Sequence, residues 1–459
     1  MSAVPRMPAL LPFLGHAIAF NRNPVRLIEE GARRYGEVFS FPLFGKTVHA
    51  LIGPRANEVF FRAQDDELGA RDAYRFTVPI FGPGVAYDVE PERMDEQLRF
   101  VHPALRNDRM QMYARIMAEE TDRFLDRWGE SGEVDLPAAL NELTLFIAGR
   151  CLIGEYFSRY LSSEFATLYR ALEGGINLIA FFNPYLPLPA MRRRDAARRR
   201  LVQLISRVIA ARKDKGEHGD DFLGALMEAR YQDGAAITDE AITGLLLTLL
   251  FAGQHTSAVL AAWTGLLLLQ HPQQLARVRE EFAGIGLSDR PTLAELKRLQ
   301  HLERCIKEGE RMRPPLVMLM RTILKPIDCL GFRLPAGGLA LVSPAVTHRL
   351  PTVFTAPERF DPDRFAPGRE EDRRQPYSLI GFGGGKHHCI GLAFAYQQVK
   401  VIWARILARY DLEATDADHP PDYTTFVVGP RPPCLIRYRR RQWSERTIAR
   451  VPATEDAMS

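Results

Sequence analysis

The chain has 459 residues, of which 46% are hydrophobic and 25% are charged, as is usual for a soluble globular protein with a large core. Its 60 Lys and Arg residues against 56 Asp and Glu residues give a net charge of only +4, which disfavours a dedicated nucleic-acid binder. Five cysteines, odd in number and widely spaced, and the lack of a basic, apolar leader lead us to expect neither secretion nor a disulfide framework.

Helical patterns dominate the chain from about residue 92 to residue 283. A helix is predicted near residues 24–35, and strands over 37–41 and 47–52 are predicted to form a β-hairpin. Further helices are predicted near residues 108–129, 137–153, 161–174, 194–213 and 238–270.

The rest of the chain alternates helices with short strands. A helix over 293–312 is predicted to end at a Pro-Pro pair, followed by strands at 317–324, 329–334 and 340–343. A loop over 351–376 leads to a helix at 390–410 and to strands at 423–428 and 434–438. Although the length allows three domains, no repeat or linker marks a boundary. We therefore expect one domain over residues 1–441 and a polar tail over 442–459.

The thirty residues from Ala241 to Gln270 contain no Asp, Glu, Lys or Arg. An uncharged stretch of this length could cross a bilayer as a helix. The middle of this stretch is polar, however, and no aromatic belt flanks both ends, so a membrane anchor is disfavoured. Thr238 and Pro272 are good start and stop signals for a helix. The stretch therefore predicts a central helix, buried in the fold and interrupted by polar residues only at its midpoint.

The segment from Phe382 to Gly391 reads Phe-Gly-Gly-Gly-Lys-His-His-Cys-Ile-Gly and lies just before the last long helix. Its glycines let the backbone approach a flat group closely, and a cysteine ahead of a helix N-terminus is placed to form a thiolate. A phosphate loop would need Ser or Thr after Lys386, where the chain has His387. A zinc site remains open, although adjacent ligands fit a tetrahedron poorly, and a merely buried cysteine would not need the glycines.

The spacing of Phe382, Gly385, Cys389 and Gly391 resembles the haem loop of the cytochromes P450. The resemblance implies a mainly α fold with small β-sheets, in which the long central helix lies over a haem. It also implies that Cys389 is the axial thiolate and metal ligand. Phe382, Gly383 and His387 would then belong to the cofactor-binding loop.

The pair Glu308 and Arg311 has an i,i+3 spacing that many other pairs in this chain share, so alone it indicates only a solvated ion pair. P450s, however, carry a Glu-x-x-Arg helix before the haem loop, and an Arg of a Pro-x-Arg-Phe segment joins it. Arg364 stands in such a segment. The resemblance therefore implies a buried structural charge cluster of Glu308, Arg311 and Arg364.

Ala252, Gly253, His255 and Thr256, in the long helix, resemble the oxygen-activation motif of P450s. Cleavage of O–O on iron needs protons in a dry site, and the hydroxyl of Thr256 and a titratable neighbour can relay them. An imidazole with an ordinary pKa near 6.5 can pass protons at neutral pH, so His255 is assigned this role in place of the usual acid. The alternative is a core histidine satisfied by a backbone carbonyl.

The run from Gly253 to Ser257 resembles the sterol 14α-demethylases, and segments at 73–88, 183–187, 314–321 and 436–441 resemble bacterial members of that family. The resemblance implies that Tyr74, Arg321 and His387 hold the haem propionates, with Asp95 a departure where relatives have a basic residue. A flat polycyclic lipid needs apolar walls. The residues that would supply them are Tyr74, Phe76, Phe81, Leu316, Val317, Met318, Phe426 and Val427.

The sequence thus predicts a soluble, cytoplasmic, bacterial haem-thiolate monooxygenase that uses haem b and O2 to oxidise a sterol or similar polycyclic lipid. By the resemblance, NAD(P)H electrons come through a ferredoxin and its reductase. The alternatives are hydroxylation of another steroid, a terpenoid or a fatty acid, and a non-catalytic haem-binding protein. The arginine-rich stretches near 192–200 and 437–441 lack interleaved aromatic residues, so they indicate solvated faces and not a nucleic-acid surface.

Overall fold

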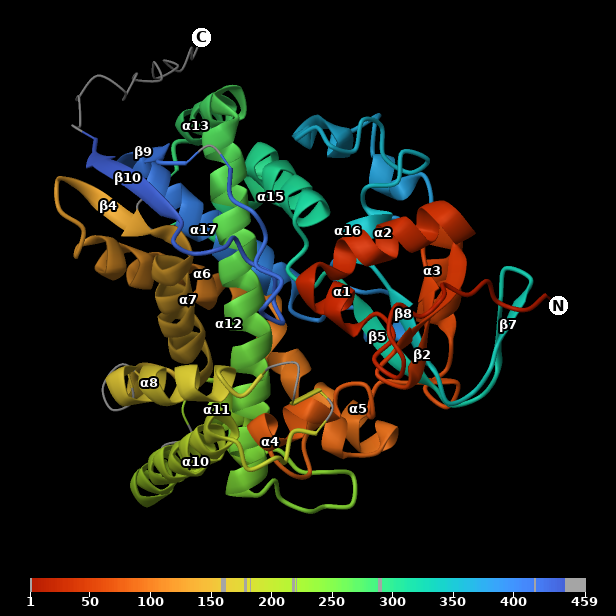
Figure 1. The fold of residues 1–459 in the computed structure, drawn as a ribbon. Coiled ribbons are helices and arrows are strands. Elements are labelled where there is room, and N and C mark those ends of the chain that lie inside the picture. Colours follow the sequence, from red (N-terminus) through yellow and green to blue (C-terminus); the bar gives the residue numbers. More distant parts are fainter. Residues whose placement is uncertain are drawn as a thin grey trace, which may run out of the picture.

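The computed structural model describes residues 2–441 apart from 158–161, 177–179, 182, 217–218, 220, 288–290 and 417. The polar tail predicted over 442–459 lies outside the described residues. One long helix, α12, crosses the centre of the molecule (Figure 1). Helices α7, α8, α10 and α11 gather on one side of it, and the largest β-sheet with α1, α2 and α3 lies on the other (Figure 1).

Helix α12 (Asp239–Gln270) is capped by Thr238, whose hydroxyl accepts a hydrogen bond from the N–H of Ala241 at 3.2 Å. It packs against α7 (Leu136–Ile153), α10 (Pro189–Lys215), α15 (Gln300–Met312) and α17 (Leu392–Arg409). A Cβ on Gly265 would lie 1.8 Å from the ring of Trp403, so only glycine allows this approach to α17. The prediction of a buried central helix is confirmed.

Helices α7 and α12 are both long and apolar enough to cross a membrane when judged by length and composition alone. In the fold, however, 67% of the apolar window of α7 and 61% of that of α12 are buried. Their apolar side chains are therefore used in packing against neighbouring helices.

The largest sheet has the strand order β1-β2-β8-β5-β3. Strands β1 (Val38–Leu43) and β2 (Lys46–Leu51) form the predicted antiparallel hairpin, and β8 (Leu339–Val342) pairs in parallel with β2. Strands β5 (Leu319–Ile323) and β3 (Leu68–Gly69) complete the sheet. A second sheet joins β4 (Ser131–Asp135), β10 (Leu435–Arg440) and β9 (Tyr410–Ala414), and a third joins β6 (Ile327–Cys329) and β7 (Phe332–Leu334).

The remaining α-helices are α1 (Ala17–Arg22), α2 (Pro24–Tyr35), α3 (Pro54–Arg62), α4 (Val78–Phe81), α5 (Pro91–Val101), α6 (Asn107–Leu125), α8 (Ser162–Glu173), α11 (Phe222–Glu228), α13 (Pro272–Ile285), α14 (Leu293–Arg298) and α16 (Pro344–Thr347).

Three predicted elements are wrong in detail. The helix predicted over 293–312 is two helices, α14 and α15, because the Glu281 carboxylate accepts hydrogen bonds from the N–H groups of His301 and Leu302 and caps a new helix there. The strand predicted at 329–334 is interrupted: it holds the end of β6, a turn with Leu330 and Gly331 at positive φ, and the whole of β7. The strand predicted at 423–428 is irregular, and the carboxylate of Asp422 bonds its own turn there.

Candidate functional site

The loop before α17 is shaped by its glycines. Gly385 has φ +59° and a Cβ there would lie 2.3 Å from the carbonyl oxygen of Phe61, so another residue would be both strained and obstructed. The N–H of Cys389 donates to the carbonyl oxygen of Phe382 at 2.8 Å, which closes the loop. Cys389 is exposed, whereas Cys151, Cys305, Cys329 and Cys434 are buried. It is the cysteine that an external group can reach.

Burial and the nearby helix start have opposite effects on the pKa of Cys389, and burial is the stronger. Burial among neighbouring protein atoms raises the pKa of its thiol, and the charge of Glu310 adds to this effect. The backbone N–H groups of Gly391 and Leu392, at the start of α17, lower the pKa but do not outweigh burial. The helix start therefore provides the donors expected from the sequence but does not hold the thiolate unaided, and a cysteine of this kind loses its proton when it binds a metal.

The midpoint of α12 differs from the rest of the helix. Ala252 is exposed and Gly253 half-buried, whereas most residues on either side are buried. A Cβ on Gly253 would meet only the ring of Phe394, at 3.9 Å, while Gly244 and Gly265 are needed for packing against protein. The Thr256 hydroxyl donates to the carbonyl oxygen of Ala252 at 2.5 Å. The motif thus presents small residues and a hydroxyl to a face that protein does not cover.

His255 lies beside Glu173, the last residue of α8, with Nδ1 3.6 Å from Oε1. Burial lowers the pKa of His255 to about 4 and raises the pKa of Glu173 to about 7. The expectation that His255 titrates near neutral pH is therefore wrong, because burial disfavours the charged imidazolium. The group that titrates near pH 7 is Glu173, which sequence reasoning missed because its partner lies on another helix.

Replacement Glu173→Gln is expected to lower turnover about tenfold or more, since removing a positioned proton donor costs at least this much. Wild-type turnover should decline above about pH 7 as Glu173 ionises, and the variant should lack this decline. Glu164→Gln, on the exposed side of α8 and paired with Arg200, is the matched control. Identical pH profiles for Glu173→Gln and the wild type would exclude Glu173 from proton delivery.

Tyr74, Tyr87 and Arg321 form a cluster on the sheet side. The ring of Tyr74 stacks on Tyr87 with centroids 5.0 Å apart, and its hydroxyl oxygen accepts from the N–H of Met320 at 3.4 Å. Arg321 is only 4% exposed, donates to the carbonyl oxygen of Phe60 and, among the described residues, has no carboxylate at ion-pair distance. A buried guanidinium without an acid partner, beside two phenols, fits an anionic group such as a haem propionate.

His387 and Lys386 face an acidic pair. Asp65 binds the Nε2 of His387 at 2.5 Å and the Nζ of Lys386 at 2.7 Å, and Asp95 lies 3.1 Å from the same Nζ. Asp95 thus balances the charge of Lys386. His387 is therefore oriented by Asp65, and Nδ1 is the ring nitrogen that would face a propionate.

Glu308, Arg311 and Arg364 meet in the interior, each 0% exposed. Arg311 donates to both carboxylate oxygens of Glu308 at 2.7 and 2.9 Å, and the Nε of Arg364 donates to the same carboxylate at 3.0 and 3.1 Å. Arg364 also donates to Glu371 at 2.8 Å, a fourth member that the sequence motif did not contain. The cluster joins α15 to the loop that precedes Cys389.

An apolar cavity lies between the N-terminal helices, the Tyr74 segment and the loop after β9. It encloses about 1020 Å³, part of it open to solvent. Five of the eight predicted substrate contacts line it, namely Tyr74, Phe76, Val317, Met318 and Phe426. The predicted contacts absent from this lining, Phe81, Leu316 and Val427, pack against the hydrophobic clusters of the core.

Aromatic rings organise this cavity around Phe76. Its ring lies 5.4 Å from that of Phe426, edge to face, and 5.7 Å from that of Phe181. Phe181 and Phe20 also line the cavity, and sequence reasoning missed both because no motif marks them. The walls can accept a flat, apolar molecule and offer few polar partners.

The residues present fit a haem: an accessible cysteine at a helix start, an unpaired buried arginine with two phenols, and small residues at the midpoint of α12. The family model of the cytochromes P450 matches residues 5–437. The chain belongs to the cytochrome P450 family. It is therefore a haem-thiolate monooxygenase that uses O2, and the predicted P450 fold is confirmed.

This P450 is similar in sequence to two curated relatives and in fold to one solved structure. It is 38% identical over 448 residues to a sterol 14-demethylase of Arabidopsis thaliana, covering 96% of this chain and 92% of that protein. It is 38% identical over 442 residues to a lanosterol 14-alpha demethylase of Bos taurus, covering 95% and 88%. A retinoic-acid-bound cyanobacterial CYP120A1 has the same fold, with a TM-score of 0.85 at 24% identity, covering 96% of this chain and all of that one.

Proposed function

We propose that this P450 removes the 14α-methyl group of a sterol by successive oxidations that end in release of formate. The apolar cavity beside Tyr74 carries the proposal, because its aromatic and aliphatic walls suit a rigid polycycle. The named activities of its relatives in plants and mammals, which align over nearly the whole chain, support the same substrate class.

The assigned roles follow the geometry. Cys389 would bind the haem iron through its thiolate, and the haem would supply the activation of O2. Arg321, Tyr74 and His387 are assigned to its propionates, and Phe382 and Gly383 to the loop that presents the cysteine. Ala252 and Gly253, which are small and little covered by protein, would leave room for O2 beside α12.

Proton delivery is assigned to Thr256 and His255. Thr256 offers a hydroxyl at the exposed face of α12, and neutral His255 lies 3.6 Å from Glu173, the group of the pair that holds the proton. Because Glu173 has a pKa near 7, it can both hold and release a proton at neutral pH. The aromatic wall around Phe76 would exclude bulk water from the reacting face.

Sterol binding is tested by titrating 14-methyl sterols into the ferric holoenzyme and measuring the low-spin to high-spin change of the haem spectrum. A saturable change is expected with these sterols, and Phe76→Ala should weaken it about tenfold, since the loss of an aromatic contact worth about 1.4 kcal/mol corresponds to this factor. Arg333→Met, on an exposed hairpin, is the control. A response only to another steroid, a terpenoid or a fatty acid would replace the sterol assignment.

P450 chemistry requires an electron donor, and we propose a ferredoxin with an NAD(P)H-dependent reductase. Oxygen consumption that depends on sterol and on an added ferredoxin system would support the proposal.

We also propose a soluble cytoplasmic enzyme, because both long apolar helices are packed within the fold.

A further inference from the structure

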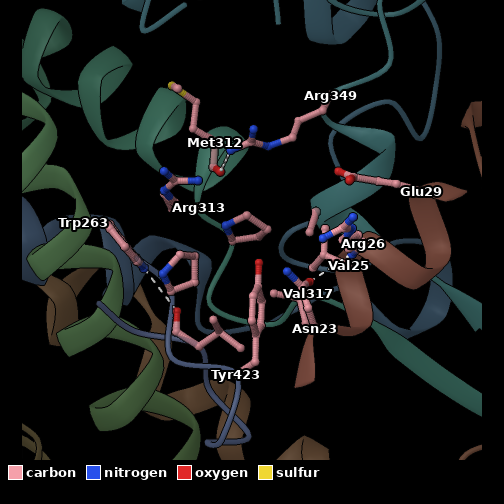
Figure 2. Close-up of a pocket in the computed structure, with 14 residues that line it drawn as sticks. Asn23, Val25, Arg26, Glu29, Trp263, Met312, Arg313, Val317, Arg349 and Tyr423 are labelled. Atoms are coloured by element: carbon pink, nitrogen blue, oxygen red, sulfur yellow. Dashed lines mark hydrogen bonds between the residues drawn. The ribbon is translucent and has the colours of Figure 1, made fainter. Parts of the chain in front are cut away.

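A second cavity, drawn in Figure 2, lies next to the apolar one and differs from it in having charged side chains in its lining. It encloses about 600 Å³, part of it open to solvent, between α2, the end of α15 and the loop after β9. Val317, Tyr423 and Val428 line both cavities and so form a shared wall. Neither the haem loop nor the midpoint of α12 contributes to its lining.

Three arginines from separate elements face this cavity (Figure 2). Arg26 comes from α2, Arg313 follows α15 and Arg349 follows α16. Glu29 is the single acid in the lining, and burial raises the pKa of its carboxyl. Arg349 is paired with Glu358 and donates to the carbonyl oxygen of Met312 at 2.9 Å. The lining thus carries an excess of positive charge.

Arg313 is the unusual member of this group. Among the described residues its guanidinium has neither a hydrogen-bond acceptor nor an ion-pair partner, and its Nε is buried without one. Its guanidinium carbon lies 5.2 Å from the centre of the Trp263 ring, which in turn is fixed by a hydrogen bond to the carbonyl oxygen of Val428 at 3.1 Å. Burial and the charge of Arg349 lower the pKa of Arg313, although the exposed Asp418 acts the other way.

Arg313 is half-buried, and its Nε is cut off from water without an acceptor among the described residues. An anion that joined the guanidinium would supply this missing partner. The hydroxyl of Tyr423 also has no hydrogen-bond partner among the described residues and points into the cavity between the arginines (Figure 2). The cavity therefore presents guanidinium and phenol donors to an oxyanion.

We propose that this cavity is a second ligand site of the enzyme, which binds a small organic carboxylate through Arg313 and Arg349, with Tyr423 as a further donor. An arginine fork matches the two oxygens of a carboxylate. Val25, Pro314 and Ala345 offer apolar surface for the rest of the ligand. Because Glu29 offsets part of the charge, a monoanion with an apolar body fits better than a phosphate dianion.

The test uses hexanoate as the probe, added to the haem-loaded full chain at constant ionic strength. Hexanoate is expected to raise Tm in a saturable way without changing the haem spectrum, whereas hexanol and chloride should not. Arg313→Met should need at least tenfold more hexanoate for the same rise. Without hexanoate its Tm should stay close to that of the wild type, because Arg313 is half-buried and makes no hydrogen bond or ion pair among the described residues.

Arg333→Met, which removes an exposed arginine of β7 paired with Asp328, is the matched control and should respond like the wild type. Tyr423→Phe removes one donor hydroxyl and should weaken the response to hexanoate several-fold. This variant tests the proposal even if Arg313→Met does not fold. If Tyr423→Phe and Arg313→Met both responded to hexanoate as the wild type does, the proposal would be overturned. So would a change in the haem spectrum, which places hexanoate in the haem cavity, or a response to inorganic phosphate but not to hexanoate.

Discussion

Replacement of Cys389 by alanine is expected to abolish the thiolate-type Soret band of the reduced, CO-treated protein and to reduce monooxygenase activity to background. The reason is geometric, because Cys389 is the exposed thiol of the chain and stands between the glycine loop and the start of α17. Without its sulfur no anionic ligand remains there to direct electron density towards oxygen. Absorption spectra and sterol-dependent oxygen consumption measure the two effects.

Cys151→Ala is the matched control, since this thiol is buried in α7 and its pKa is raised by burial. It should keep the Soret band and activity while lowering the free energy of unfolding by about 1 kcal/mol, as expected for the loss of a small buried side chain. Persistence of the band in Cys389→Ala would show that another residue binds the iron. Loss of the band in both variants would instead indicate damage to the fold.

The parts of the fold that depend on continuous sequence could be predicted. Helix α12 carries its own start signal at Thr238 and a long uncharged interior, so both its bounds and its burial follow from local pattern. The loop around Cys389 is equally local, since the glycines that shape it are its neighbours in sequence. The break between α14 and α15 was missed because Glu281, which caps α15, belongs to another helix.

The site itself depends on contacts between distant segments. The motif at 252–257 identifies His255, but its pKa is set by burial, and α8 brings Glu173 to 3.6 Å from its ring. In the same way the Asp65 carboxylate that orients His387 follows α3 and carries no motif. Sequence therefore names candidate site residues but not the neighbours that surround them in the fold.

The second large effect is expected at the buried charge cluster, in the variant Arg364→Leu. Arg364 holds Glu308 and Glu371 together, and all three side chains are at most 1% exposed. Removing one partner of a buried ion pair costs about 3–5 kcal/mol, because the remaining charges stay buried without compensation. This is a large share of the roughly 5–15 kcal/mol that stabilises a typical domain. Arg364→Leu should therefore unfold at markedly lower denaturant and lose haem readily.

The pH dependence of stability gives this prediction a second readout. Burial tends to raise the pKa of Glu371, but hydrogen bonds from Arg369 and the Thr355 N–H, together with Arg364, hold it below its ordinary value of 4.5. A carboxyl whose pKa is lowered by folding stabilises the fold above that value, and the contribution is lost as the pH falls below it. The stability difference between wild type and Arg364→Leu should accordingly be largest at neutral pH and shrink in acid.

The control is the ion pair made by Asp363, the residue that precedes Arg364 in sequence. Arg277 binds Asp363 with two hydrogen bonds of 2.7 and 3.0 Å, but both side chains are more than a third exposed. Water screens such a pair, so Arg277→Leu should cost less than about 1 kcal/mol and leave the haem in place. Arg364→Lys keeps the charge but not the planar fork, so it should fall between the two. Equal stability losses in Arg277→Leu and Arg364→Leu would mean that the buried cluster adds no more to this fold than an exposed ion pair.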